Sequence, residues 1–241
     1  MELRFDFHLH SCLSPCGDMR MTPATVAGMC ALAGLDVAAL TDHNSCGNCA
    51  AFCAAAKAYG LLALPGMELC TAEEIHVICL LPDLDRAAAF SREVRENLPN
   101  IPNAPEIFGP QVLMDKEDRI LGEEPLLLSG ASFFSIVDLP ALMERYDGVA
   151  WPAHIDRPSY SILSNLGLWD PTLGFPLAEI SRCCPPDFFQ RRDLLGIPMI
   201  TGCDAHSLEQ IPDQFSSMEV SERSRSAVLT WLRGGGPGIR F

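Results

Sequence analysis

The residues of this chain with the clearest chemical potential are its six histidines. His8 and His10 lie near the N-terminus, where apolar and polar residues alternate as they do along a strand with one buried face. Side chains at positions i and i+2 of a strand point the same way, so the two imidazoles could share a metal ion. Two surface histidines on an edge strand would give the same short pattern, so the rest of the chain has to decide.

Three further histidines follow apolar runs that are typical of buried strands. The runs cover residues 35–40, 149–153 and 199–202, and the histidines after them are His43, His154 and His206. The last one, His76, begins a strand over residues 75–81. The connection between Glu68 and this strand is too short for a crossover helix, so we expect a hairpin that brings His76 near Glu68.

Strands and helices alternate along most of the chain, and this alternation predicts a (β/α) barrel of roughly seven units. Further strands are expected over residues 61–64, 177–180 and 218–220. Helices are expected over residues 23–33, 84–98, 136–146 and 186–195. Two further helices are expected, one that ends near residue 60 and one that ends at residue 232. Thr22 and Pro23 mark the first helix start, because threonine caps a helix and proline suits its first turn.

In a (β/α) barrel the C-terminal ends of the strands form one mouth, and the active site lies there. Five of the histidines follow or end a predicted strand, and the sixth begins a strand that returns from Glu68. Histidines scattered through a core or a surface would not sort in this way. Asp18, Glu68 and Asp204 stand at comparable points, so the pattern predicts a site for several metal ions.

Length and composition predict a single domain over residues 1–241, since 241 residues with 48% hydrophobic side chains can bury a large core. Residues 99–130 interrupt the alternation and are expected to form an irregular insertion with a hairpin. The net charge of −14 predicts that the protein does not bind long nucleic acid, although it allows a small phosphorylated substrate. No apolar run could span a membrane and no signal peptide is recognisable, so we expect no membrane contact and a cytoplasmic location.

Eleven cysteines in a cytoplasmic chain predict free thiols rather than a disulfide framework. The tightest cluster is Cys46, Cys49 and Cys53, whose spacing places them on one face of a helix, a face that ordinarily packs into a core. An iron–sulfur or zinc–thiolate site is the alternative, although no second cysteine pair at the usual spacing supports it.

Taken in order, the histidine motifs resemble the PHP family, named for members in DNA polymerases and histidinol phosphatases. The matching pieces are His8-Leu9-His10, Thr41-Asp42-His43, Gly66-Met67-Glu68, Glu74-Ile75-His76, Pro152-Ala153-His154 and Cys203-Asp204-Ala205-His206. Each piece is short, but the set keeps the family's order and spans nearly the whole chain. The resemblance implies an α/β fold, a distorted (β/α)7 barrel with two or three divalent metal ions at the C-terminal ends of its strands.

Carried over residue by residue, the resemblance implies three metal positions. The first would use His8, His10, Glu68 and Asp204. The second would share Glu68 and add His76 and His154. The third would use His43 and His206 with a residue from the loop after the first strand, where many family members have a histidine and this chain offers Asp18.

Imidazoles mixed with a few carboxylates suit Zn²⁺, Mn²⁺ or Fe²⁺. Two such ions can activate a bridging hydroxide for attack at phosphorus, with Glu68 and Asp204 holding the metals. Arg157 follows His154 closely and could bind phosphate oxygens through its planar guanidinium, although a surface salt bridge is the alternative. Arg182 has the same two interpretations, and Asp42 could orient an imidazole or cap the next helix.

These features predict a metal-dependent phosphoesterase, most simply a phosphatase for a small phosphomonoester. One alternative is a nuclease or oligonucleotide phosphodiesterase, and a second is a PHP module that binds metal without catalysis. A redox or iron–sulfur protein built on the cysteines is a third. The sequence does not name the phosphoester or indicate an oligomeric state.

Overall fold

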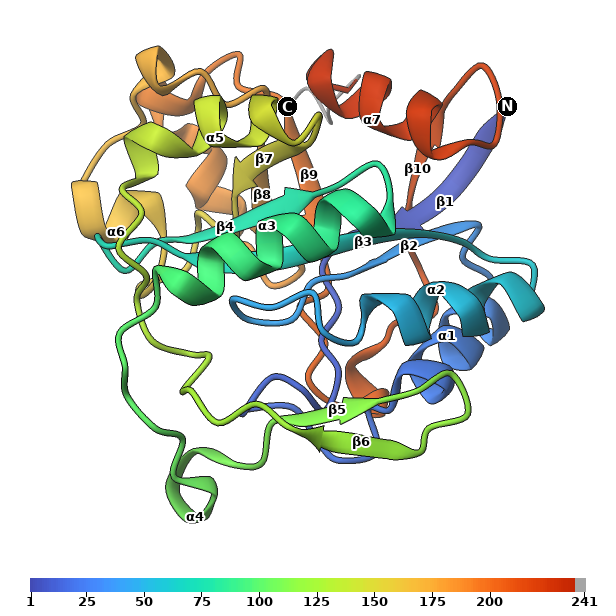
Figure 1. Cartoon of the computed structure of the whole chain (residues 1–241). Helices are drawn as coiled ribbons and strands as arrows, with labels where there is room; N and C mark the ends of the chain where they lie inside the picture. The colour runs from blue at the N-terminus through green and yellow to red at the C-terminus, as the bar shows by residue number, and fades with distance from the viewer. Residues whose placement is uncertain (237–241) are drawn as a thin grey trace.

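The computed structural model describes residues 1–236, and the main feature of these residues is a curled sheet of six strands (Figure 1). Its order is β10 (Ser216–Glu219), β1 (Glu2–Asp6), β2 (Val37–Leu40), β3 (Leu62–Cys70), β4 (His76–Leu80) and β7 (Val149–Pro152). Neighbours β1, β2 and β3 are parallel, whereas the pairs β10–β1, β3–β4 and β4–β7 are antiparallel.

A second, parallel pair of strands extends the curl beyond β7: β8 (Ala178–Ser181) and β9 (Met199–Gly202). An isolated bridge between Leu9 and Ala205 then ties the chain after β9 back to the chain after β1. The ends of the strands that carry the candidate ligands therefore lie close together. The mixed α/β fold agrees with a distorted barrel.

Seven regular β/α units are not seen in residues 1–236, because β4 and β10 run against the other strands of the sheet. The predicted helix over residues 186–195 is also wrong. That stretch holds two short 3-10 helices, Pro186–Gln190 and Arg192–Leu194, separated by the extended backbone of Arg191. This irregular path lets the adjacent rings of Phe188 and Phe189 both pack against the core, which one helical face could not do.

The described residues form two large hydrophobic clusters and two small ones. Helices α1 (Pro23–Leu32), α2 (Cys49–Ala58), α3 (Leu84–Glu96) and α5 (Leu139–Arg145) contribute to one of the large clusters, and α7 (Arg225–Arg233) contributes to the other. Figure 1 shows α3 lying across β3 and β4, with α1 and α2 side by side. The predicted start of α1 is confirmed, since the Thr22 side chain accepts a hydrogen bond from the Thr25 N–H and Pro23 occupies the first turn. The two remaining short α-helices are α4 (Pro105–Phe108) and α6 (Ile162–Leu166).

Two hairpins are present where the sequence predicts them. Strands β3 and β4 pair antiparallel from Cys70 opposite His76 to Gly66 opposite Leu80. In the insertion, β5 (Val112–Met114) pairs with β6 (Ile120–Glu123), and this hairpin lies below α1 and α2 in Figure 1. The first hairpin matters for the site, because it holds Glu68 and His76 on adjacent strands.

The first strand is shorter than its alternating sequence suggests. Leu3, Phe5 and Phe7 share one hydrophobic cluster, and the rings of Phe5 and Phe7 stack with centroids 4.8 Å apart. Leu9 belongs to the other cluster, because β1 ends at Asp6 and the chain is irregular before the bridge at Leu9. Within residues 1–236, no helix is long and apolar enough to cross a membrane.

Candidate metal centre

The chain segments after β1 and after β9 run side by side and place four candidate ligands together. The Asp204 N–H donates to the His8 carbonyl at 2.9 Å, and the His10 N–H donates to the Ala205 carbonyl at 3.1 Å. His10 and His206 stack with ring centroids 4.0 Å apart. These backbone contacts therefore bring His8 and His10, from the start of the chain, together with the candidate ligands after β9.

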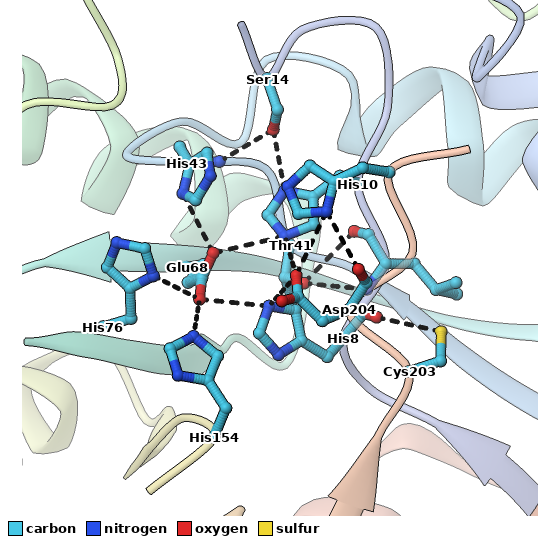
Figure 2. Close-up of polar contacts among 12 residues, drawn as sticks. His8, His10, Ser14, Thr41, His43, Glu68, His76, His154, Cys203 and Asp204 are labelled. Atoms are coloured by element: carbon cyan, nitrogen blue, oxygen red, sulfur yellow. Dashed lines mark hydrogen bonds and ion pairs between the residues drawn. The ribbon is translucent and has the colours of Figure 1, made fainter. Parts of the chain in front are cut away.

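Glu68, on β3, is fully buried, and its carboxylate is the centre of the cluster (Figure 2). Its Oε1 lies 3.2 Å from His8 Nε2, 2.9 Å from His76 Nδ1 and 3.1 Å from His154 Nε2. Its Oε2 lies 3.0 Å from His43 Nδ1 and 3.3 Å from His10 Nε2. Five imidazoles from four parts of the chain thus face one carboxylate.

Asp204 provides the second carboxylate of the cluster. Its Oδ1 lies 3.1 Å from Nε2 of both His8 and His10, and 3.5 Å from Nδ1 of His206. The backbone of Asp204 has a φ of 50°, and that of His154 has a φ of 29°. Non-glycine residues rarely adopt this left-handed region, and such strain gathers at functional sites.

Several polar atoms of this cluster are buried without a hydrogen-bond partner, which is uncommon because it leaves each atom desolvated and unpaired. These atoms are His8 Nε2, His10 Nε2, His43 Nδ1, Glu68 Oε2, His154 Nδ1 and Asp204 Oδ1. Most of them are the atoms that approach each other at 3.0–3.3 Å. Imidazole nitrogens and carboxylate oxygens that converge without hydrogen-bonding geometry fit divalent metal ions placed between them.

The described residues contain three groups of potential ligand atoms, and within each group the atoms lie within 4.8 Å of one another. The groups are His8, His10, Glu68 and Asp204; His43, Glu68 and His76; and His10, His43 and His206. The first group has the same members as the first predicted metal position. The second places His43 beside Glu68 and His76, where the sequence analysis expects His154.

Asp18 is the candidate that the structure does not bring into the cluster. Its N–H donates to the His206 carbonyl at 2.8 Å, so the loop lies in the expected place, but its carboxylate is paired with Arg20 at 2.8 Å. Against the effect of burial, Glu68 and then the thiol of Cys16, in the same loop, raise the pKa of His43. Cys16 was missed, although it lies in the same loop as Asp18.

Glu179, on β8, is a second residue that the sequence analysis missed. Its fully buried carboxylate accepts a hydrogen bond from His8 Nδ1 at 2.7 Å, which directs His8 Nε2 toward Glu68 and Asp204. A Cβ at Gly202 would lie 2.6 Å from this carboxylate, so the glycine makes room for it. A single glutamate within the apolar run of residues 177–180 was the available signal.

Asp42 orients His10 and not His43, its neighbour in the sequence. Its Oδ1 accepts hydrogen bonds from the Ser11 N–H at 2.6 Å and from the Ser14 hydroxyl at 2.7 Å. The Ser14 hydroxyl is also 2.9 Å from His10 Nδ1, as Figure 2 shows. Asp42 therefore acts on His10 through Ser14, and its neighbour His43 is not its partner.

Opposite charges fix the protonation of the cluster in the absence of metal. Burial favours neutral forms, but the imidazoles around Glu68 and Asp204 outweigh it and hold both carboxyl pKa values below their ordinary range. Burial likewise opposes protonation of His10 and His43, yet the carboxylates raise both pKa values to about 9. Burial dominates at His206 and lowers its pKa to about 3. Metal uptake must therefore displace protons from His10 and His43.

A cavity of about 180 Å³ opens onto the cluster and is lined by His76, Arg157, Ser159 and Tyr160 among other residues. Arg157 Nη1 lies 2.5 Å from Asp204 Oδ2, and the side chain is 41% exposed, so its guanidinium can reach both the cluster and the cavity. Tyr160 stacks on His76 with centroids 4.6 Å apart. Arg182 does not line the cavity and donates to the Gln214 carbonyl at 2.6 Å.

The sequence matches no protein-family model, and a search of curated proteins gave no significant match. Solved structures do share its fold. The lesion-specific endonuclease Q of Pyrococcus furiosus aligns with a TM-score of 0.68 at 17% identity, over 98% of this chain and 57% of the endonuclease. A protein of Bifidobacterium adolescentis proposed to be a metal-dependent phosphoesterase aligns with a TM-score of 0.62 at 16% identity, over 98% and 97% of the two chains. This chain therefore shares the fold of these two proteins.

The shared fold supports the resemblance on which the sequence analysis relied, and the two neighbours are named as an endonuclease and as a metal-dependent phosphoesterase. A further structure, an endonuclease Q complex with a 27-mer duplex that carries an abasic lesion at the active site, aligns with a TM-score of 0.64 at 17% identity. This alignment covers 98% of the present chain and 57% of the endonuclease, so the chain spans little more than half of that protein.

The duplex complex overturns the prediction that the net charge of −14 excludes long nucleic acid. Net charge sums over the whole surface, whereas binding depends on the local field at the site. Bound divalent cations can reverse that field within an acidic protein. Net charge alone therefore does not exclude a nucleic acid as a ligand of a protein with this fold.

Proposed function

We propose that this protein is a metal-dependent phosphoesterase whose buried cluster holds two or three divalent ions, Zn²⁺, Mn²⁺ or Fe²⁺. The observation that carries the proposal is the set of buried, unpaired nitrogen and oxygen atoms directed at one another around Glu68. In this proposal His8, His10, Glu68 and Asp204 hold one ion. Glu68 and His76 hold a second with His154 or His43, and His206 belongs to a third with His43 and the loop that contains Asp18.

When bound, such ions lower the pKa of a water and offset negative charge on a phosphoryl group. The chain's own residues supply the arrangement. Glu68 and Asp204 bring negative charge to the centre of the imidazoles, and Glu179 fixes the direction of His8. Arg157 stands at the edge of the cavity, where its guanidinium can hold phosphoryl oxygens that do not face the cluster.

We propose a small phosphomonoester as the substrate, because the cavity of about 180 Å³ is smaller than most ligand pockets, which measure roughly 300–1,000 Å³. A single phosphoryl group with little else buried would suit that space. The second candidate is a nuclease or oligonucleotide phosphodiesterase, favoured by the fold shared with endonuclease Q.

One assay separates these candidates. The protein, reconstituted separately with Mn²⁺, Zn²⁺ and Fe²⁺, would be tested on phosphomonoesters, phosphodiesters and a DNA duplex with an abasic lesion. The first candidate predicts the highest kcat/KM for a phosphomonoester, and the second predicts cleavage of a diester or of the duplex. Failure to hydrolyse any phosphoester with bound metal would contradict both.

The metal content is the first prediction. Gently purified protein should contain two or three transition-metal equivalents per chain, because the ligand atoms form three adjoining groups. Inductively coupled plasma mass spectrometry measures this directly. One equivalent or none after reconstitution would contradict a cluster of several metals.

The Glu179→Gln substitution is expected to weaken metal binding by about 10- to 100-fold, the usual cost of removing a carboxylate that orients a metal-binding histidine. Glutamine keeps the size of the side chain but weakens the hydrogen bond to His8 Nδ1. Competition with a chelator at fixed pH measures the affinity. Glu219→Gln is the matched control, since Glu219 is an exposed strand residue of β10, and it should bind metal as the wild type does.

A further inference from the structure

Cys46 and Cys49 form a Cys-x-x-Cys pair at the start of α2, outside the metal centre. The Cys49 N–H donates to the Cys46 carbonyl at 3.0 Å, and this turn brings the two residues together. Both thiols donate to the same acceptor, the Gly66 carbonyl, at 3.2 and 3.3 Å. Two sulfur atoms thus gather at one carbonyl oxygen.

Cys53 does not complete a metal site with this pair. The structure of residues 1–236 contains no group of three ligating side chains that includes a cysteine. The thiol of Cys53 instead contacts Arg225. The iron–sulfur and zinc–thiolate alternatives of the sequence analysis therefore gain no support, and the two close thiols need another explanation.

The pair is accessible from one side. Both cysteines line a cavity of about 350 Å³ between α2, α3 and the insertion hairpin. Cys46 is 8% exposed and Cys49 is 1% exposed, so a reagent that enters the cavity meets Cys46 first. The adjacent Cys46 thiol and burial hold the pKa of the Cys49 thiol well above its ordinary range, so Cys46 is the thiol that reacts first.

We propose that Cys46 and Cys49 form a reversible dithiol–disulfide site that exchanges with low-molecular-weight disulfides. The Cys46 thiolate attacks one sulfur of the disulfide RS–SR, which forms a mixed disulfide and releases one RS⁻. The Cys49 thiolate then attacks the Cys46 sulfur, the internal S–S bond forms, and the second RS⁻ leaves. The two protons lost by the cysteines end on the two released thiols, so one RS–SR is reduced and the dithiol is oxidised.

The backbone can accommodate this bond without a large rearrangement. A disulfide requires Cα atoms about 4.4–6.8 Å apart, and the hydrogen-bonded turn between Cys46 and Cys49 brings its ends within about 7 Å. The reaction requires no metal and no hydrolytic activity, so the proposal is independent of the proposed function.

The test uses the reduced, full-length protein and glutathione disulfide as the probe. After incubation, free thiols are alkylated in acid-quenched samples, and fragmentation mass spectrometry locates the modified cysteines. Wild-type protein should lose alkylation at both Cys46 and Cys49, with the mass of two hydrogen atoms missing and full recovery in dithiothreitol. In Cys49→Ser, Cys46 should instead retain glutathione, because no second thiol can displace it.

Cys53→Ser is the matched control, since Cys53 lies one turn further along α2, and it should form the internal disulfide as the wild type does. Cys16, which is exposed, reports that the probe is reactive. Glutathione on Cys16 together with full alkylation of Cys46 and Cys49 in the wild type would overturn the proposal. This comparison decides the matter even if a variant does not fold.

Discussion

Glu68→Gln is expected to remove most of the bound metal and to lower kcat/KM for the best phosphoester by more than about 100-fold. Losing a residue that only orients a ligand already costs about 10- to 100-fold, and Glu68 faces five imidazoles directly. Glutamine preserves the shape of the side chain but removes its charge and one acceptor oxygen. Metal content after reconstitution with Mn²⁺ and steady-state kinetics measure the two effects.

Glu74→Gln provides the matched control for this prediction. Glu74 is exposed in the turn between β3 and β4, so the same chemical change is made on the same hairpin, away from the cluster. This variant should keep its metal and its activity. A Glu68→Gln protein with full metal content and near wild-type kcat/KM would show that Glu68 is not a ligand.

The grouping of the histidines could be predicted because it depends on topology more than on detail. Each histidine stands at the end or the beginning of an apolar run, and strand ends meet when a sheet curls. The antiparallel pairing of β3 and β4 likewise follows from a connection too short for a helix. Glu68 and His76 therefore come together without any knowledge of the side chains around them.

The residues that orient the ligands could not be predicted, because they depend on contacts between distant segments. Glu179 contacts His8 across 171 residues of chain, and although a glutamate in an apolar run stands out, the run does not show which residue it will contact. The loop after β1 shows the same limit. Asp18 is close in the chain to the cluster, but the neighbouring Arg20 pairs with its carboxylate, and the thiol of Cys16 acts on the pKa of His43.

The regular alternation of strands and helices along the sequence was the least reliable guide to the fold. It predicts a helix over residues 186–195, where the paired rings of Phe188 and Phe189 favour a broken path. It also gives no direction to a strand, and the reversed strands β4 and β10 are what distinguish this sheet from a regular barrel. Strand direction depends on the connections, which periodicity does not describe.

Arg157→Ala is expected to lower kcat/KM by about 30- to 1,000-fold, or roughly 2–4 kcal/mol of transition-state stabilisation, the range for losing an oriented donor to a developing charge. The guanidinium lies at the cavity edge and pairs with Asp204 Oδ2 at 2.5 Å. It can therefore hold phosphoryl oxygens beside the cluster. Arg157→Lys should recover only part of the loss, because lysine keeps the charge without the planar fork.

Metal content separates this role from a structural one. If Arg157 serves only to hold Asp204, the alanine variant should lose metal and activity together. If it binds the phosphoryl group, the metal stays and only kcat/KM falls. Arg182→Ala is the matched control, because its guanidinium donates to the Gln214 carbonyl away from the cavity, and it should leave both quantities unchanged. An unchanged kcat/KM in Arg157→Ala would show that Arg157 and its contact with Asp204 contribute nothing to the reaction.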